Sequence, residues 1–265
     1  MRFVSFSSGS SGNCTLLDSD TTHLLVDVGI SRKKTIESLA KMDLGLSDIN
    51  GIFITHEHTD HISGLRLIAQ KTKMPIYATQ GTINAILKMP ESTQIDPERF
   101  IAVKPDEKLT VGDITACPIH ISHDAADPVG YRFRCGTKKA CVCTDLGCFN
   151  DYTAACLKNS DVVLLEANHD VNMLETGPYP YPLKRRIMSE QGHLSNANAG
   201  ELLCRVLNDH MKAIFLGHLS QENNLPELAY ETVRLEIMGE QTEYRADELP
   251  IHIARRRDMS QAVEW

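Results

Sequence analysis

A short apolar run that leads directly into a cluster of histidines constrains this chain more than any other part of its sequence. Residues 51–55 read Gly-Ile-Phe-Ile-Thr, which predicts a buried strand. Residues 56–61 read His-Glu-His-Thr-Asp-His and precede a helix expected over 62–71. Three imidazoles and a carboxylate on so short a loop cannot all point away from one another. Neutral imidazole and carboxylate are the usual ligands of zinc and similar divalent cations, so the pattern predicts a metal site at a strand end.

The rest of the chain alternates short β-rich runs with helical patterns. Further strands are expected at 23–28, 76–79, 101–104, 113–121, 161–166, 213–216 and 251–254, and a hairpin from 131–134 and 140–144. Helices are expected at 32–42, 80–88, 196–209 and 225–238, whereas 171–192 is the least regular segment. Because no linker or repeat interrupts this alternation, we expect one α/β domain over residues 1–265, with helical layers covering two sheets.

Bulk properties narrow the possible classes of protein. The 265 residues contain no apolar run of about 18, so we expect no transmembrane helix, and the first residues do not resemble a signal peptide. Eight irregularly spaced cysteines do not indicate a disulfide scaffold, which favours a cytoplasmic location. The formal net charge of −8 argues against a nonspecific nucleic-acid coat, but it permits a nuclease with a local basic patch.

Three more residues with ligand chemistry follow predicted strands. His123 comes just after 113–121, Asp145 follows the hairpin, and His218 follows 213–217. Strand ends are where open α/β folds place their sites. Each residue alone could be an ordinary polar loop residue, but together with 56–61 they supply enough ligands for two metal ions.

The order of these residues resembles the metallo-β-lactamase superfamily over nearly the whole chain. The resemblance implies a four-layer αββα sandwich and two divalent metal ions, zinc or manganese, with iron also possible. The implied ligands are His56, His58 and His123 for one ion, Asp60, His61 and His218 for the other, and Asp145 between them. Asp27, which matches the first motif of the superfamily, would orient a ligand histidine. The alternative for Asp27 is a capped strand end.

Longer motifs resemble the YycJ/WalJ-like branch of that superfamily. They read Phe-Ser-Ser-Gly-Ser-Ser-Gly-Asn-Cys over 6–14, Ser-His-Asp-Ala over 122–125, Glu-Ala-Asn-His-Asp over 166–170 and Gly-His-Leu-Ser-Asn over 192–196. The branch implies a nuclease that acts on DNA from a 5′ end and is linked to bacterial DNA repair. The interval between Asp145 and His193 is too short for a β-CASP insertion, so we expect the compact form without one.

The same resemblance gives candidate catalytic residues. His193 would contact the scissile phosphate or protonate the leaving oxygen, and the alternative is a histidine that merely opens a helix. Glu166 resembles the acidic motif that accompanies such a histidine, and its carboxylate would favour the proton-donating form.

Candidate substrate contacts come from three segments. The loop over 7–13 supplies Ser8, Ser11 and Asn13, because small residues let backbone amides approach a phosphate, although a tight turn would explain the loop equally well. His169 lies in the motif over 166–170, and Lys184 and Arg185 lie in a basic run over 184–186 that could also be simply solvated. A second basic run, 255–257, is expected to be only a tail.

The sequence therefore favours a binuclear phosphodiesterase that acts on nucleic acid, preferably DNA, through a hydroxide that bridges the two ions. Such a site could equally open esters, lactones, thioesters or β-lactams, and a non-catalytic, metal-stabilised regulatory protein is a further alternative. The loop over 7–13, Glu166, His193 and the run over 184–186 together favour a phosphodiester.

Overall fold

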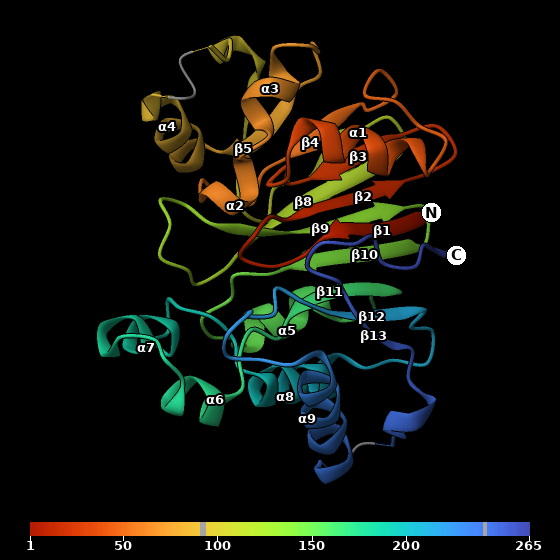
Figure 1. The fold of residues 1–265 in the computed structure, drawn as a ribbon. Coiled ribbons are helices and arrows are strands. Elements are labelled where there is room, and N and C mark those ends of the chain that lie inside the picture. Colours follow the sequence, from red (N-terminus) through yellow and green to blue (C-terminus); the bar gives the residue numbers. More distant parts are fainter. Residues whose placement is uncertain (91–93, 241–242) are drawn as a thin grey trace.

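The computed structural model describes residues 1–90, 94–240 and 243–265. Within these residues the strands form two seven-stranded sheets that lie face to face between two layers of helices (Figure 1). Sheet A contains β1 (Arg2–Ser7), β2 (Cys14–Asp18), β3 (His23–Val26), β4 (Gly51–Phe53), β5 (Ile76–Thr79), β6 (Phe100–Val103) and β14 (Val263–Glu264). Sheet B contains β7 (Leu109–Val111), β8 (Ile114–His120), β9 (Val129–Cys135), β10 (Lys138–Cys143), β11 (Val162–Glu166), β12 (Ala213–Gly217) and β13 (Ile251–Ile253). The predicted αββα sandwich is confirmed.

Both sheets are mixed, and their parallel halves set the position of the site. The order β14-β1-β2-β3-β4-β5-β6 makes β3 to β6 parallel neighbours, and the order β13-β12-β11-β10-β9-β8-β7 makes β10 to β13 parallel neighbours. Residues that follow these strands therefore emerge at one edge of each sheet.

The helices cover the outer faces of the two sheets. They are α1 (Arg32–Ala40), α2 (Thr59–Ile62), α3 (Leu65–Ala69), α4 (Gln80–Lys88), α5 (Asp151–Leu157), α6 (Val171–Thr176), α7 (Tyr181–Ile187), α8 (Asn196–Val206) and α9 (Pro226–Gly239), with 3-10 turns η2 (Pro97–Arg99) and η3 (Ala246–Glu248). Buried residues of α1, α3 and α4 pack on sheet A, and those of α5, α8 and α9 pack on sheet B. No helix in these described ranges is long and apolar enough to span a membrane.

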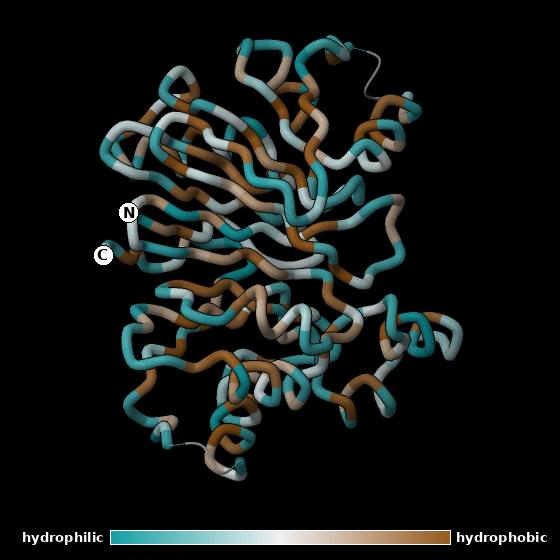
Figure 2. The backbone as a smooth tube through the Cα atoms, turned by 180° about the vertical axis from the view of Figure 1, so that it is seen from behind, coloured by the Kyte–Doolittle hydropathy of each residue, from teal (hydrophilic) through white to brown (hydrophobic). Residues whose placement is uncertain are grey.

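A third apolar cluster fills the space between the sheets. Its centre is Phe53, which stacks on Tyr77 with ring centroids 4.6 Å apart and meets the edge of Tyr131 at 5.3 Å. Figure 2 shows apolar segments along the strands and hydrophilic segments at the outer turns. The alternation of inward and outward side chains along the strands thus gives each sheet two apolar faces.

Three expectations from the sequence were wrong. The helix expected over 62–71 is replaced by two short helices, α2 and α3, because the backbone N–H of Gly64 donates to the carbonyl of Val28 at 2.8 Å and not to a carbonyl one turn earlier. The segment 171–192 contains α6 and α7, with Pro182 in the first turn of α7, where a helix needs no N–H from it. Residues 255–257 are not a tail, because the chain continues to β14, which pairs with β1.

Candidate metal centre

The segment 56–61 follows β4 and is held by the loop after β3. The backbone N–H of Asn13 donates to the carbonyl of Asp60 at 2.7 Å, and the backbone N–H of Gly29 donates to the carbonyl of Asn13 at 2.7 Å. A Cβ at Gly29 would lie 1.6 Å from the Asp60 carbonyl oxygen, so only glycine permits this approach. The close packing of these three backbones fixes where the histidine segment lies.

Three candidate residues leave their strands with a left-handed backbone. Asp27 after β3, Asp145 after β10 and His218 after β12 have φ of 57°, 59° and 54°. Side chains rarely adopt this region, and such conformations concentrate at functional sites. All three residues therefore leave their strands with the same backbone conformation, and their side chains lie at the same edge of the sandwich.

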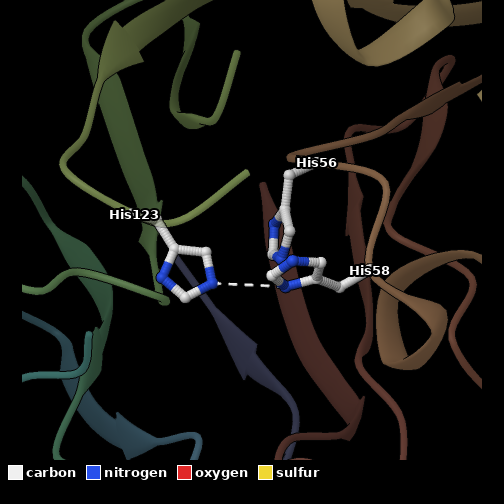
Figure 3. A group of neighbouring side chains, drawn as sticks. All are labelled: His56, His58 and His123. Atoms are coloured by element: carbon white, nitrogen blue, oxygen red, sulfur yellow. Dashed lines mark hydrogen bonds between the residues drawn. The ribbon is translucent and has the colours of Figure 1, made fainter. Parts of the chain in front are cut away.

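The first group of candidate ligands consists of His56, His58 and His123 (Figure 3). Their ligand atoms lie within 4.8 Å of one another, and Nε2 of His123 is 3.3 Å from Nδ1 of His58. Nδ1 of His123 contacts the carbonyl oxygen of Gly192 at 3.0 Å, which makes it the protonated nitrogen and leaves Nε2 as the lone-pair atom that faces the group. His56 and His58 come from sheet A and His123 from sheet B.

The second group consists of Asp60, His61 and His218, and Asp145 lies between the two groups. Nε2 of His218 is 3.4 Å from Oδ2 of Asp60, and Nε2 of His61 is likewise 3.4 Å from that atom. Oδ2 of Asp145 is 3.2 Å from Nε2 of His61, and its Oδ1 is 3.8 Å from Nε2 of His123. The structure therefore brings together every residue that the sequence predicted as a metal ligand.

Further polar residues hold these side chains from behind. Oδ2 of Asp27 lies 2.8 Å from Nδ1 of His61, and Oδ1 of Asp27 accepts a bond from the backbone N–H of Thr55. Glu166 contacts two histidines through one oxygen, with Oε1 2.8 Å from Nδ1 of His193 and 3.0 Å from Nδ1 of His218. Each of these contacts fixes a ring orientation, which is what a carboxylate does behind a metal-binding histidine.

The two groups differ in their protonation. Burial lowers the pKa of His56 well below its usual range and also lowers the pKa of His123. Burial opposes the charge on His218 too, but neighbouring carboxylates, chiefly Asp145, outweigh it and raise the pKa of His218 to about 10. The same balance raises the pKa of His61 well above its usual range. Without metal, His56 and His123 are therefore neutral at neutral pH, whereas His61 and His218 carry a proton on both ring nitrogens.

Unpaired buried atoms show that this donor set fits cations. Within the described part of the chain, Nε2 of His56, Nε2 of His218 and Oδ2 of Asp145 are buried without a hydrogen bond of good geometry. The last two atoms lie only in the ion-pair contacts given above, and Nε2 of His56 lies in none. Buried polar atoms normally make hydrogen bonds, so a buried atom that makes none requires an explanation, such as a bound ion. Imidazole nitrogens and a carboxylate oxygen suit zinc, manganese or iron, so the residues present fit a divalent metal centre.

A cleft of about 230 Å³ opens onto the second group. Its walls include Asp60, Asp145, His193 and His218. The cleft is also lined by Ser10, Asn168 and Arg186, which lie in segments that the sequence pointed to, and by Tyr179 and Ser220, which it did not single out. Arg186 pairs with Asp124 through its guanidinium, which fixes α7 against the loop after β8. Only the basic run over 184–186 pointed toward this arginine.

The loop over 7–13 lies beside the cleft, but Ser8, Ser11 and Asn13, which were predicted to contact phosphate, do not line it. Asn13 is buried, with its Nδ2 3.2 Å from Oδ2 of Asp60 and 3.0 Å from Nε2 of His61. Ser8 is buried, and its Oγ accepts a bond from the backbone N–H of His218. Ser11 is exposed and does not line the cleft, whereas Ser10 does. Asn13 and Ser8 thus support the candidate ligands.

The remaining predicted substrate contacts lie outside the cleft. His169 is buried, and the burial lowers its pKa to about 4. The Nζ of Lys184 donates to the carbonyl of Glu175, and Arg185 is exposed on α7. None of these three residues lines the cleft, where Arg186 is the basic residue.

Comparison with known proteins agrees with this geometry. A family model described as "Beta-lactamase superfamily domain" matches residues 22–215. The exodeoxyribonuclease YycJ of Bacillus anthracis is 40% identical over 233 residues, which are 88% of each chain. The exodeoxyribonuclease WalJ of Streptococcus pneumoniae serotype 2 is 40% identical over 232 residues, covering 88% of this chain and 86% of WalJ. The solved metallo-β-lactamase fold protein YhfI of Bacillus subtilis, 18% identical, shares the fold with a TM-score of 0.70 over 98% of both chains.

This chain belongs to the metallo-β-lactamase superfamily, and it is a metal-dependent hydrolase. Within that superfamily its sequence is similar to the proteins named YycJ and WalJ, as the motifs over 6–14, 122–125, 166–170 and 192–196 indicated.

Proposed function

We propose that this protein is a single-domain, binuclear exodeoxyribonuclease that acts from the 5′ end of DNA and serves DNA repair. The observation that carries the proposal is the contact of 2.8 Å between Glu166 and His193 at the wall of the cleft, beside the predicted metal ligands. The names of YycJ and WalJ support the same substrate class. An ester, lactone, thioester or β-lactam substrate does not require such a pair.

The residues of the chain divide the work in this proposal. Bound divalent cations would activate water and neutralise the charge of the phosphate. His56, His58 and His123 would hold one cation, Asp60, His61 and His218 would hold the other, and Asp145 would contact both. Zinc and manganese both suit these ligands, and iron is a third possibility.

His193 would serve the leaving group. Glu166 contacts Nδ1 of this histidine and is fully buried, so the carboxylate fixes the orientation of the ring. Nε2 is then the nitrogen available to donate a proton to the departing oxygen. Although burial opposes ionisation of Glu166, the contacts with His193 and His218 outweigh it and hold the pKa of Glu166 at about 2. The carboxylate is therefore charged whenever the enzyme works.

The test uses DNA duplexes labelled at either the 5′ or the 3′ end, incubated with manganese- or zinc-loaded protein. We expect short labelled products from the 5′-labelled strand only, and no products with His58→Ala, whose metal content should fall. The matched control His210→Ala changes an exposed histidine far from the cleft and should cleave like the wild type. Cleavage of ester or lactam substrates without cleavage of DNA would contradict the proposal.

A further inference from the structure

The segment that follows β13 borders a second, larger groove next to the cleft. This groove has a volume of about 1020 Å³, and Arg255, Arg256 and Arg257 form part of its wall. It shares Ser220 with the cleft and also contains Ser8, whose Oγ accepts the backbone N–H of His218. The groove therefore begins where the predicted metal centre ends.

The backbone under the arginines is fixed to both sheets. The backbone N–H of Ala254 donates to the carbonyl of Leu216 in sheet B, and that of Ser8 donates to the carbonyl of Arg255. Farther along, the backbone N–H of Ser260 donates to the carbonyl of Ser5 in sheet A. In Figure 1 this segment (blue) runs from β13 back toward the strands of the other sheet. Charged groups on such a fixed base are held in place without further ordering.

The three arginines have different surroundings. Arg256 is partly buried, packs its Cγ against Gly9 and donates from Nη2 to the carbonyl of Leu219 at 2.6 Å. Arg255 and Arg257 are exposed, and neither forms an ion pair with a carboxylate in the described ranges. Arg186 at the cleft, in contrast, already pairs with Asp124. The two exposed guanidinium groups are available to an external anion.

The other walls of the groove are partly aromatic. Tyr230 of α9 and the ring of His252 line it, and His252 lies against Phe215 with ring centroids 5.4 Å apart. The carboxylates of Glu227 and Asp258 also line the groove, and Asp258 directly follows Arg257 in the chain, so the cationic part of the wall consists of the arginines alone. A groove lined by both guanidinium groups and aromatic rings suits a single nucleic-acid strand, in which phosphates and unpaired bases are both accessible. A duplex would keep its bases out of reach of the rings.

We infer that this groove binds the single-stranded part of the DNA that continues beyond the nucleotide in the cleft, with Arg255 and Arg257 on its phosphates. The inference rests on the proposed nuclease function, because it assumes that a longer strand must leave the cleft. It makes the groove a strand-binding site, separate from the residues that carry out the hydrolysis.

The experiment compares the wild type with the double variant Arg255→Ala/Arg257→Ala, which keeps Arg256 and its hydrogen bond to the carbonyl of Leu219. The matched control Lys108→Ala/Arg134→Ala removes the same charge from two exposed residues outside the groove and the cleft, one just before β7 and one in β9. The binding probe is a fluorescent, cleavage-resistant phosphorothioate single strand of about 12 nucleotides, measured by anisotropy on manganese-loaded protein. Thermal unfolding verifies that both variants fold.

We expect the groove variant to bind the single strand about 10- to 100-fold more weakly. The slope of the logarithm of its binding constant against the logarithm of the salt concentration should become smaller by about 1.4, which is about 0.7 for each lost phosphate contact. For cleavable strands its KM should rise with little change in kcat, and hydrolysis of a dinucleotide should stay at the wild-type rate. Affinity for a blunt duplex should change less than affinity for the single strand. The control variant should match the wild type in every assay.

The outcomes separate this inference from the proposed function. Wild-type cleavage of DNA together with unchanged strand binding by the groove variant, or an equal loss in the control, would overturn the groove and leave the nuclease intact. Strand binding that depends on Arg255 and Arg257 in a protein that cleaves no DNA would support the groove and overturn the nuclease. A loss confined to duplex DNA would overturn the single-strand assignment.

Discussion

Oε1 of Glu166 lies 2.8 Å from Nδ1 of His193, and the same oxygen lies 3.0 Å from Nδ1 of His218. One buried carboxylate therefore joins the predicted proton donor to a predicted metal ligand. Any change in the charge of Glu166 should affect both.

Glu166→Gln keeps the shape of the side chain and removes its charge. We expect kcat to fall at least about 100-fold, because the imidazole of His193 loses the carboxylate that orients it. Metal content, measured on the same samples, separates this effect from a loss of metal caused by a displaced His218. The control is Glu190→Gln, which changes an exposed carboxylate. An unchanged kcat at full metal content would remove His193 and Glu166 from the proposed reaction.

The contribution of metal to stability should increase with pH. His218 has a pKa raised from 6.5 to about 10, so in the metal-free protein its charge stabilises the fold fully below about pH 6.5, and this stabilisation is lost as the pH rises through 10. Metal binding requires the neutral ring of His218, so metal affinity should increase as the pH rises. The difference in Tm between metal-loaded and chelator-treated protein should therefore widen between about pH 6 and pH 8. A constant difference over that interval would show that His218 is not a ligand.

Asp27→Asn should weaken metal binding. Oδ2 of Asp27 lies 2.8 Å from Nδ1 of His61, and loss of such a carboxylate typically lowers metal affinity about 10- to 100-fold. The chain contains a matched pair away from the cleft, in which Oδ2 of Asp18 lies 3.1 Å from Nδ1 of His23. Asp18→Asn should lower thermal stability and leave metal affinity, measured by competition with a chelating dye, unchanged. Equal losses of metal in both variants would mean that Asp27 acts only through the fold.

Gly29→Ala should disturb the segment 56–61 directly. The added Cβ would meet the Asp60 carbonyl oxygen at 1.6 Å, so the backbone must shift, at a cost of at least about 1–3 kcal/mol in unfolding free energy. Because the shifted residue is a predicted ligand, metal content should fall as well. Gly239→Ala, where a Cβ meets nothing within 4 Å, is the control and should stay within about 0.5 kcal/mol of the wild type. Normal stability and metal content in Gly29→Ala would disprove the close approach.

The sequence predicted those parts of the fold whose signals are local. The strand Ile76–Thr79 and the helix Gln80–Lys88 were predicted with their observed bounds, because Thr79 both ends the strand and caps the helix by accepting a bond from the N–H of Thr82. The predicted metal ligands were also found together, because each follows a strand and strand ends converge at one edge.

The sequence could not reveal features that depend on contacts between distant segments. Asn13 looked like a phosphate contact, but it lies against Asp60, 47 residues away. Arg255 and Arg257 looked like a tail because their neighbours, the loop over 7–13 and the end of β12, are far away in sequence. At the helix break, the backbone N–H of Gly64 donates to the carbonyl of Val28, which is distant in sequence, and no local pattern encodes this contact.

The division of the predicted ligands between the two sheets has a consequence for how the protein matures. Each group takes two ligands from sheet A and its third from sheet B, either His123 or His218. In a nascent chain the first group can form only once the end of β8 has packed on sheet A, and the second group waits for His218, which directly follows β12. We therefore expect the second cation to bind only after most strands of both sheets have been made, so that it would stabilise a nearly complete fold.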